Sequence, residues 1–189
     1  MTDEKVLAAP YLDEVRRNFR GYKRMADAAL TQLTDSNFFH APDHESNSAA
    51  VIVKHVAGNL RSRWTDFLTT DGEKPDRNRD HEFILEQGLS RQELLRGWEE
   101  SFGILFNTIE SLTAEDFGRT VTIRGEPLTV LQAVNRSLMH TVYHVGQIVY
   151  LAKHLRGAEW KTLSIPRGKS AEFNATKPED RKVKAPNRL

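Results

Sequence analysis

Cysteine is absent from this chain of 189 residues. Its absence excludes disulfides, zinc ribbons, thiolate metal ligands and cysteine nucleophiles. Histidine, which occurs seven times, is therefore the residue type left to bind a borderline metal ion such as zinc. The chain is long enough to form one domain with a continuous core and no covalent cross-links.

An excess of either charge is also lacking, since 27 Lys and Arg residues stand against 26 Asp and Glu residues. A balanced chain gives no electrostatic reason to expect nucleic acid or an anionic membrane as a partner. No run approaches about 18 consecutive apolar residues, and residues 1–5 lack the basic and then apolar pattern of a signal peptide. We therefore expect a cytoplasmic protein that binds neither nucleic acid nor membranes.

Apolar residues recur at intervals of three and four in four segments, a spacing typical of amphipathic helices. Two of the segments begin with a capping box, in which Ser or Thr precedes Glu or Gln by three residues. These boxes are Ser90 with Glu93 and Thr129 with Gln132. The sequence predicts an all-α fold with helices over residues 10–33, from Asn47 or Ser48 to 67, over 90–112 and over 129–155.

The segments between these helices are polar or lack a helical period. Residues 34–45 and 69–80 are rich in Asp, Asn and Pro, which predicts loops. Residues 120–123 alternate between polar and apolar side chains, and residues 124–127 have the composition of a turn. This pattern predicts a short hairpin or extended excursion. An extended tail should complete a domain over residues 1–174, and a mobile basic tail should follow over 175–189. Large apolar residues should anchor the extended tail on the helices: Trp160, Leu163, Ile165 and Phe173.

Two histidines, His140 and His144, lie four residues apart in the last predicted helix. Residues at this spacing share one helix face, so both imidazoles can reach one metal ion. His55, inside the second predicted helix, is the candidate for a third ligand. Three imidazoles with a fourth position left to water are the composition of a catalytic zinc site rather than a closed structural one.

The last helix is apolar over most of its circumference, which indicates burial by more than one neighbour. At about 100° per residue, the two histidines project away from the main apolar stripe, and Met139, Tyr143 and Tyr150 occupy yet another side. The other sides should line the cavity that holds the histidines or meet a second subunit. The main stripe consists of Leu131, Val134, Leu138, Val142, Val145, Val149 and Ala152.

Other polar residues have two interpretations each. Asn59, Ser137 and Gln147 either orient the histidines from behind or satisfy one another. Several basic residues either form an anion-binding rim or pair with nearby acids: Arg61, Arg63, Arg77, Arg79, Arg167 and Lys169. The remaining histidines should be solvated: His40, His44, His81 and His154.

A histidine on the second helix and a His-x-x-x-His pair on the fourth resemble the DinB-like (DinB/YfiT-like) superfamily of metalloproteins, and within it an uncharacterised bacterial branch. The resemblance rests on residues 47–48, 55–75, 140–148 and 165–170, and it covers roughly residues 10–174. It implies a DinB/YfiT-like four-helix bundle, often a homodimer, that holds zinc or nickel, or else iron or manganese, on His55, His140 and His144. Relatives of known activity include transferases and isomerases that activate a low-molecular-weight thiol.

Three hypotheses about function follow. The first is a divalent-metal-dependent enzyme with a small-molecule substrate, for example a small-thiol-dependent S-transferase. The second is a metal-binding, stress-associated or regulatory protein without turnover, and the third makes the histidines polar core groups and the last helix a dimer surface. Thr141 stands where the His-Glu-x-x-His hydrolases have glutamate, so the sequence assigns no catalytic residue and disfavours peptide hydrolysis.

Overall fold

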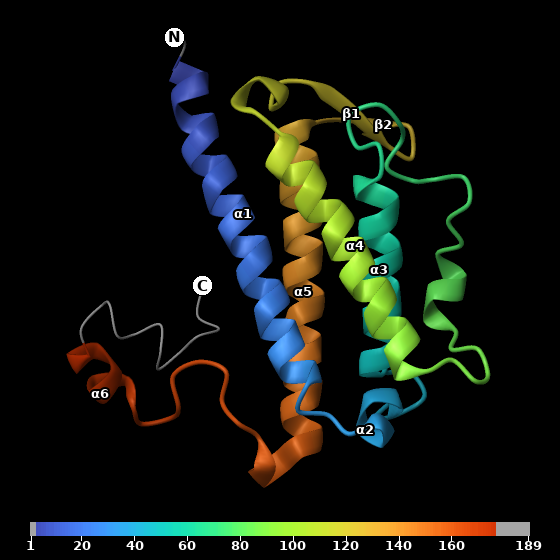
Figure 1. Ribbon diagram of the computed structural model, residues 1–189, viewed down its shortest axis with the longest axis vertical. Coiled ribbons are helices and arrows are strands. Elements are labelled where there is room, and N and C mark those ends of the chain that lie inside the picture. Colours follow the sequence, from blue (N-terminus) through green and yellow to red (C-terminus); the bar gives the residue numbers. More distant parts are fainter. Residues whose placement is uncertain (1–2, 177–189) are drawn as a thin grey trace.

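Four long helices dominate the part of the chain that the computed structural model describes, residues 3–176 (Figure 1). They are α1 (Asp3–Leu30), α3 (Ala49–Trp64), α4 (Arg91–Ser111) and α5 (Val130–Arg156). α3 packs against α4 and α5, and α1 packs against α5 and α4. The mostly helical fold predicted from the sequence is confirmed. None of the helices in this part of the chain has the length and hydropathy needed to cross a lipid bilayer.

Side-chain caps fix the starts of three of these helices. The Ser48 hydroxyl accepts the Val51 N–H at the start of α3, so Ser48 rather than Asn47 is the cap. Both predicted capping boxes are present at the starts of α4 and α5. A cap satisfies backbone N–H groups that have no partner inside the helix, and its loss costs about 1 kcal/mol.

The first helix is longer at its N-terminal end than predicted. It begins at Asp3, so Pro10 lies inside it rather than in its first turn. Pro10 is exposed, while Ala8 and Leu12 on either side of it are buried. The apolar face therefore continues past the proline, at the cost of one backbone hydrogen bond. At the other end α1 stops at Leu30, and residues 31–33 form turns.

The helix predicted to reach Phe67 ends at Trp64. Thr65 is extended and Asp66 has a φ of 48°, a left-handed conformation that Asp tolerates better than most residues. Phe67 is nevertheless buried, because its ring stacks on Trp64 with the centroids 4.9 Å apart. Because Phe67 packs on Trp64, the helical spacing of apolar residues in the sequence continues past the end of α3.

Two short helices lie in segments predicted to be loop or extended. α2 (Asp35–Phe39) is capped by Thr34 and buries Phe38, and α6 (Ser170–Ala175) buries Phe173. Helices of five or six residues are too short to show a period in the sequence. Trp160 and Leu163 pack against the core as predicted, and Ile165 is half-buried. The predicted mobile tail lies outside the described residues from residue 177 onward.

The predicted hairpin is present at one end of the helices. β1 (Thr120–Ile123) pairs antiparallel with β2 (Glu126–Thr129), and Val121 and Ile123 are buried. The turn residues Arg124 and Gly125 both have positive φ, as a two-residue type I′ turn requires. β2 leads directly into α5, so the hairpin lies above the helix that carries two of the histidines (Figure 1).

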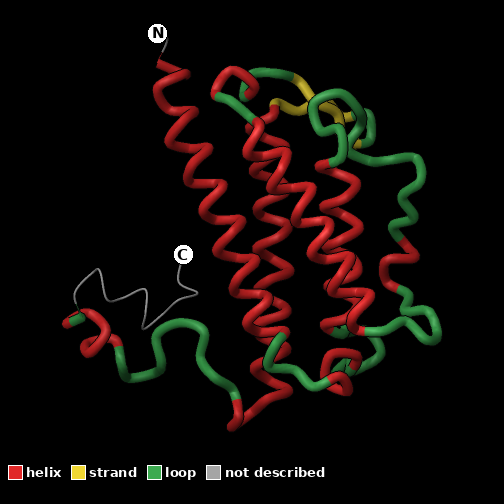
Figure 2. The backbone as a smooth tube through the Cα atoms, in the orientation of Figure 1, coloured by secondary structure: helices red, strands yellow, loops and turns green. Residues whose placement is uncertain are grey.

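The long connection between α3 and α4 runs along the outside of α3 and contains the short 3-10 helix η1 (Asp80–Phe83) (Figure 2). Its first part is tied to the hairpin by Asp71, whose carboxylate accepts the backbone N–H groups of Glu73, Arg124 and Gly125 at 2.7–2.8 Å. Burial alone would raise the pKa of Asp71, but these bonds bring it well below its usual value.

We expect Asp71→Ala to lower the free energy of unfolding by about 1–3 kcal/mol, because three N–H groups lose a charged acceptor. Urea unfolding followed by circular dichroism would measure the change. Asp43→Ala is the matched control, since Asp43 bonds Glu45 and Ser46 in an exposed loop, and it should cost less. Equal losses in the two variants would contradict the role given to Asp71.

Candidate metal centre

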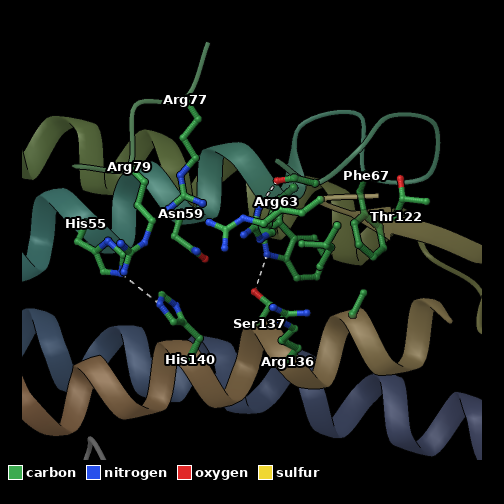
Figure 3. A pocket seen from close by; sticks show the side chains of 15 residues that line it. His55, Asn59, Arg63, Phe67, Arg77, Arg79, Thr122, Arg136, Ser137 and His140 are labelled. Carbon is green, nitrogen blue, oxygen red and sulfur yellow. Dashed lines mark hydrogen bonds between the residues drawn. The ribbon is translucent and has the colours of Figure 1, made fainter. Parts of the chain in front are cut away.

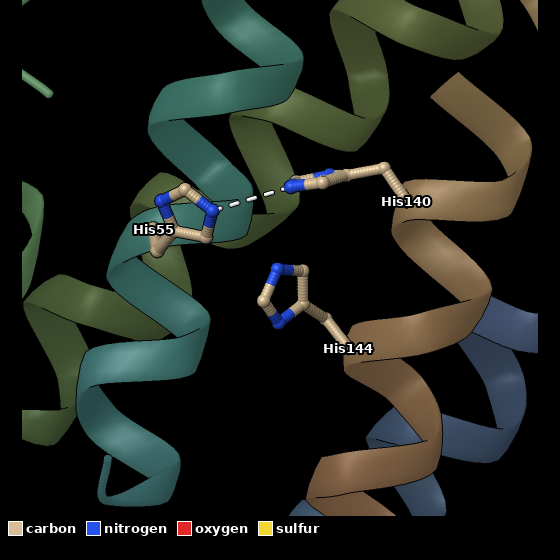
Figure 4. Close-up of side chains that lie close together, drawn as sticks. All are labelled: His55, His140 and His144. Carbon is tan, nitrogen blue, oxygen red and sulfur yellow. Dashed lines mark hydrogen bonds between the residues drawn. The ribbon is translucent and has the colours of Figure 1, made fainter. Parts of the chain in front are cut away.

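The three predicted ligands lie together between two helices. His55 projects from α3, and His140 and His144 project toward it from α5 (Figure 4). One nitrogen from each ring lies within 4.8 Å of the others, and the Nε2 atoms of His55 and His140 are 3.2 Å apart. The i, i+4 spacing on α5 and the packing of α3 on α5 produce this arrangement.

These distances fit a shared divalent ion. Two nitrogens bound to a tetrahedral zinc ion at about 2.0–2.1 Å each lie roughly 3.3 Å from one another. The His55–His140 separation is close to this value, and the third nitrogen is near enough to join after a small ring rotation. The three rings could therefore hold one metal ion.

Burial keeps the α5 histidines neutral. It lowers the pKa of His140 to about 3, and the neighbouring His144 and His55 lower it further in the same direction. Burial also lowers the pKa of His144, although the bond to Gln147 opposes this. Neutral imidazoles keep the lone pair that metal binding requires, so His140 and His144 can bind an ion at neutral pH without first losing protons.

The stability of the metal-free protein should therefore depend on pH. Below about pH 6.5 the unfolded chain binds protons on His140 and His144 that the folded chain rejects, so stability falls as the pH falls toward 3. Between pH 7.5 and 5 we expect a loss on the order of 1–2 kcal/mol, reduced from the full value because water reaches part of the rings. Urea unfolding after chelation would show it. The same loss in a His140→Ala, His144→Ala variant would assign the effect to other groups.

Glu82 orients His55 from behind. Its Oε2 lies 2.8 Å from Nδ1 of His55, so Nδ1–H donates to the carboxylate and the Nε2 lone pair faces the other two histidines. Glu82 is buried, which alone would raise its pKa, but the bonds from His55 and Arg77 lower it below the usual value. Arg77 supplies two of these bonds, from Nε to Oε1 at 2.8 Å and from Nη2 to Oε2 at 3.0 Å.

Gly58 provides the space for this carboxylate. A Cβ atom added at Gly58 would lie 2.3 Å from Oε1 and 2.7 Å from Cδ of Glu82. Gly58 is one turn from His55 on α3, so the helix presents the histidine and the gap for its partner together. The sequence analysis named neither Glu82 nor Gly58. The signal that could have revealed them is a glycine in the interior of a helix, three residues after a candidate ligand.

Gln147 plays the corresponding part for His144, with Oε1 2.7 Å from Nδ1 of the ring. This bond was one of the two interpretations given above. Ser137 instead accepts a hydrogen bond from Nε1 of Trp64 at 2.9 Å, and Asn59 lies in the wall of a pocket. The remaining histidines are exposed, as predicted: His40, His44, His81 and His154.

The predicted apolar stripe of α5 is buried or half-buried at every position but one. Leu131, assigned to the main apolar stripe, is exposed, whereas Ser137 and His144 are buried. α5 packs against both α1 and α3, so its buried arc is wider than one stripe and includes the histidine side. The predicted burial of this helix by more than one neighbour is confirmed.

A pocket of about 210 Å³ opens beside His55 and His140 (Figure 3). Arg63, Arg77 and Arg79 line it, so half of the predicted basic set lies at the site, although Arg63 and Arg77 also pair with Glu73. The other members lie elsewhere: Arg61 pairs with Glu100, Lys169 pairs with Glu172, and Arg167 is exposed. Two further lining arginines were missed by the sequence analysis, Arg124 of the hairpin and Arg136 of α5.

Comparison with family models gives a match over most of the chain. The model of a family described as "Protein of unknown function (DUF1572)" matches residues 6–169, which is most of the chain. None of the curated proteins matches the chain. The matched segment contains all three histidines, Glu82 and the whole pocket.

Proposed function

The chain belongs to the DUF1572 family of proteins of unknown function, and from its site we propose that it is a divalent-metal-dependent enzyme. The observation that carries the proposal is the set of three converging imidazoles, of which His55 and His144 each bond a further side chain through Nδ1. Histidines with only a structural role could satisfy their hydrogen bonds among themselves, without a further side chain behind each ring. His55 and His140 also line a pocket, and histidines that a further side chain orients beside a pocket are typical of metal sites that act on a substrate.

The donor set fits the ion. His55, His140 and His144 would hold it, and three imidazole nitrogens without thiolate suit zinc or nickel, with iron or manganese as alternatives. A divalent ion bound there would lower the pKa of a coordinated water or thiol and supply a nucleophile near neutral pH. Glu82 is bonded to both His55 and Arg77, so its role is to position a ligand.

For the reaction we propose that the sulfur of a low-molecular-weight thiol attacks an electrophilic carbon and displaces its leaving group, while the thiol proton is released to solvent, within a DinB/YfiT-like four-helix bundle. The support is the resemblance described above together with the order of the ligands, one on α3 and two on α5. The proposed setting is the cytoplasm, where small thiols are kept reduced. The pocket beside the histidines provides room for a small substrate.

The alternative proposal is a metal-binding protein without turnover, with a stress-associated or regulatory role. One observation favours it: no carboxylate lines the pocket among the described residues, and the two histidines that line it would be occupied by the ion, so a free general base is lacking there. Attack by a thiol whose pKa a bound ion would lower needs no such base, so this observation does not count against the transferase.

The test is to measure metal and activity on the same tag-free protein. Elemental mass spectrometry should find about one equivalent of zinc or nickel per chain, as a three-histidine site predicts. A panel of low-molecular-weight thiols with an aromatic electrophile should then give conjugate with the loaded protein and none after chelation. Metal without turnover on any thiol would support the binding protein instead. No metal, even after reconstitution, would overturn both proposals.

We also propose that α5 forms a homodimer contact. Its outer side exposes Met139, Tyr143 and Tyr150, each more than 60% accessible, and large apolar side chains grouped in this way often mark interfaces. Sedimentation equilibrium should give twice the chain mass. Tyr143→Glu with Tyr150→Glu should shift it to the chain mass, because paired charges oppose burial. A wild-type monomer would refute this contact.

A further inference from the structure

The pocket beside the histidines is unusually rich in arginine. Five arginines line it, and none of the described lining residues is Asp or Glu. They come from α3, the α3–α4 connection, the hairpin and α5, so four parts of the fold direct positive charge at one cavity. These residues are Arg63, Arg77, Arg79, Arg124 and Arg136.

Two of the arginines are already committed. Arg63 and Arg77 have side chains only 11% and 4% exposed. Arg63 bonds the Gly72 carbonyl and Glu73, while Arg77 bonds Glu73 and both oxygens of Glu82. They hold the pocket wall and the histidine partner in place and have little capacity left for a ligand.

The other three arginines are available. Arg79, Arg124 and Arg136 are 51%, 54% and 50% exposed, and their ion pairs with acids are long, at 3.9, 3.3 and 3.4 Å. Exposed ion pairs of this kind contribute little to stability, so replacing them with bonds to a ligand costs little free energy. Guanidinium groups match the oxygens of carboxylates and phosphates in geometry as well as charge.

The rest of the lining suits a small organic molecule. Trp64, Phe67, Ile123 and Ala133 provide apolar surface, and Asn59 and Ser137 are polar groups on the walls. At about 210 Å³ the pocket is smaller than the usual range of roughly 300–1,000 Å³ for drug-sized ligands. His55 and His140 close one end (Figure 3).

We propose that this pocket binds a small organic anion. Arg79, Arg124 and Arg136 hold its carboxylate or phosphate group, and its other end faces His55 and His140. The second statement rests on the proposed function, because the group facing the histidines would be the one that meets the ion. The first does not, since the arginines are present with or without metal.

Calorimetric titration of the full-length protein tests the first statement. Succinate and methylphosphonate distinguish carboxylate from phosphate-like ligands, and succinamide is the uncharged control. Arg79→Gln with Arg136→Gln should weaken binding of the preferred anion about tenfold or more, since each loses a charge-assisted bond. Arg17→Gln with Arg61→Gln removes the same charge from exposed positions outside the pocket and should leave binding unchanged.

Zinc-loaded protein tests the second statement. Mercaptosuccinate should bind more tightly than succinate, because its thiol reaches the ion while its carboxylates meet the arginines. Equal affinities would place the anion away from the histidines and overturn that part. Absence of saturable binding by either anion, binding of succinamide as tight as succinate, or equal weakening in both double variants would overturn the whole inference.

Zinc content measured on the same samples separates the two proposals. Anion binding without zinc uptake would remove the proposed function and leave the anion pocket. Zinc uptake without anion binding would do the reverse.

Discussion

Changing both His140 and His144 to alanine will reduce bound metal from about one equivalent per chain to none, because one imidazole cannot hold an ion that needs three protein ligands. The variant should still fold, since the apolar core is formed by other side chains of the four long helices. Elemental mass spectrometry after zinc reconstitution would measure the metal, and circular dichroism would report the helix content.

The chain provides a matched control for this experiment. His40 and His44 are also four residues apart, but both are exposed and outside a helix. His40→Ala with His44→Ala also removes two imidazoles and should leave the metal content unchanged. Retention of metal by the α5 variant, or its loss from the control, would show that the ion binds elsewhere.

Gly58→Ala should weaken metal binding by about 10–100-fold although Gly58 touches no ion, which is the range seen when a partner behind a ligand is lost. The new methyl group would lie 2.3 Å from Oε1 of Glu82, so the carboxylate must move away from His55 and Arg77. The same movement leaves buried polar groups with poorer bonds and should cost about 1–3 kcal/mol of stability. Competition with a chromophoric zinc chelator would give the affinity.

Gly103→Ala in α4 is the control for that substitution. A Cβ at Gly103 meets nothing within 4 Å, so alanine there should be neutral or stabilise the helix by up to about 1 kcal/mol. Equal metal affinity in the Gly58→Ala variant and the wild type would show that the carboxylate does not control the orientation of His55. A loss of metal affinity in both glycine variants would point to a general effect of replacing glycine in a helix.

Local patterns predicted the helices and the placing of two of the clustered histidines on one helix face. Capping boxes placed the starts of α4 and α5, and the i, i+4 spacing placed His140 and His144 on one side of α5. Both signals act within a few residues of one helix, so they can be recognised without knowing what the helix packs against.

The partners of those ligands could not be predicted in the same way. Glu82 lies 27 residues beyond His55, in a connection with no period, and only the fold of that connection brings the carboxylate to the ring. Arg124 and Arg136 meet at the pocket because the hairpin leads into α5. The predicted start of α1, residue 10, is a proline, which is common in the first turn of a helix, but packing on both sides of Pro10 outweighs that preference.

The position of Glu82 in the α3–α4 connection has a kinetic consequence. Connections of this kind open more readily than helices that share a core, and the free energy of such local opening is only part of the global one. Opening residues 65–90 would free His55 from its carboxylate while α3 and α5 stay packed. We therefore expect the residence time of a bound ion to follow the hydrogen-exchange rate of this connection rather than the unfolding rate of the protein, so that an ion can be exchanged many times within the lifetime of one folded chain.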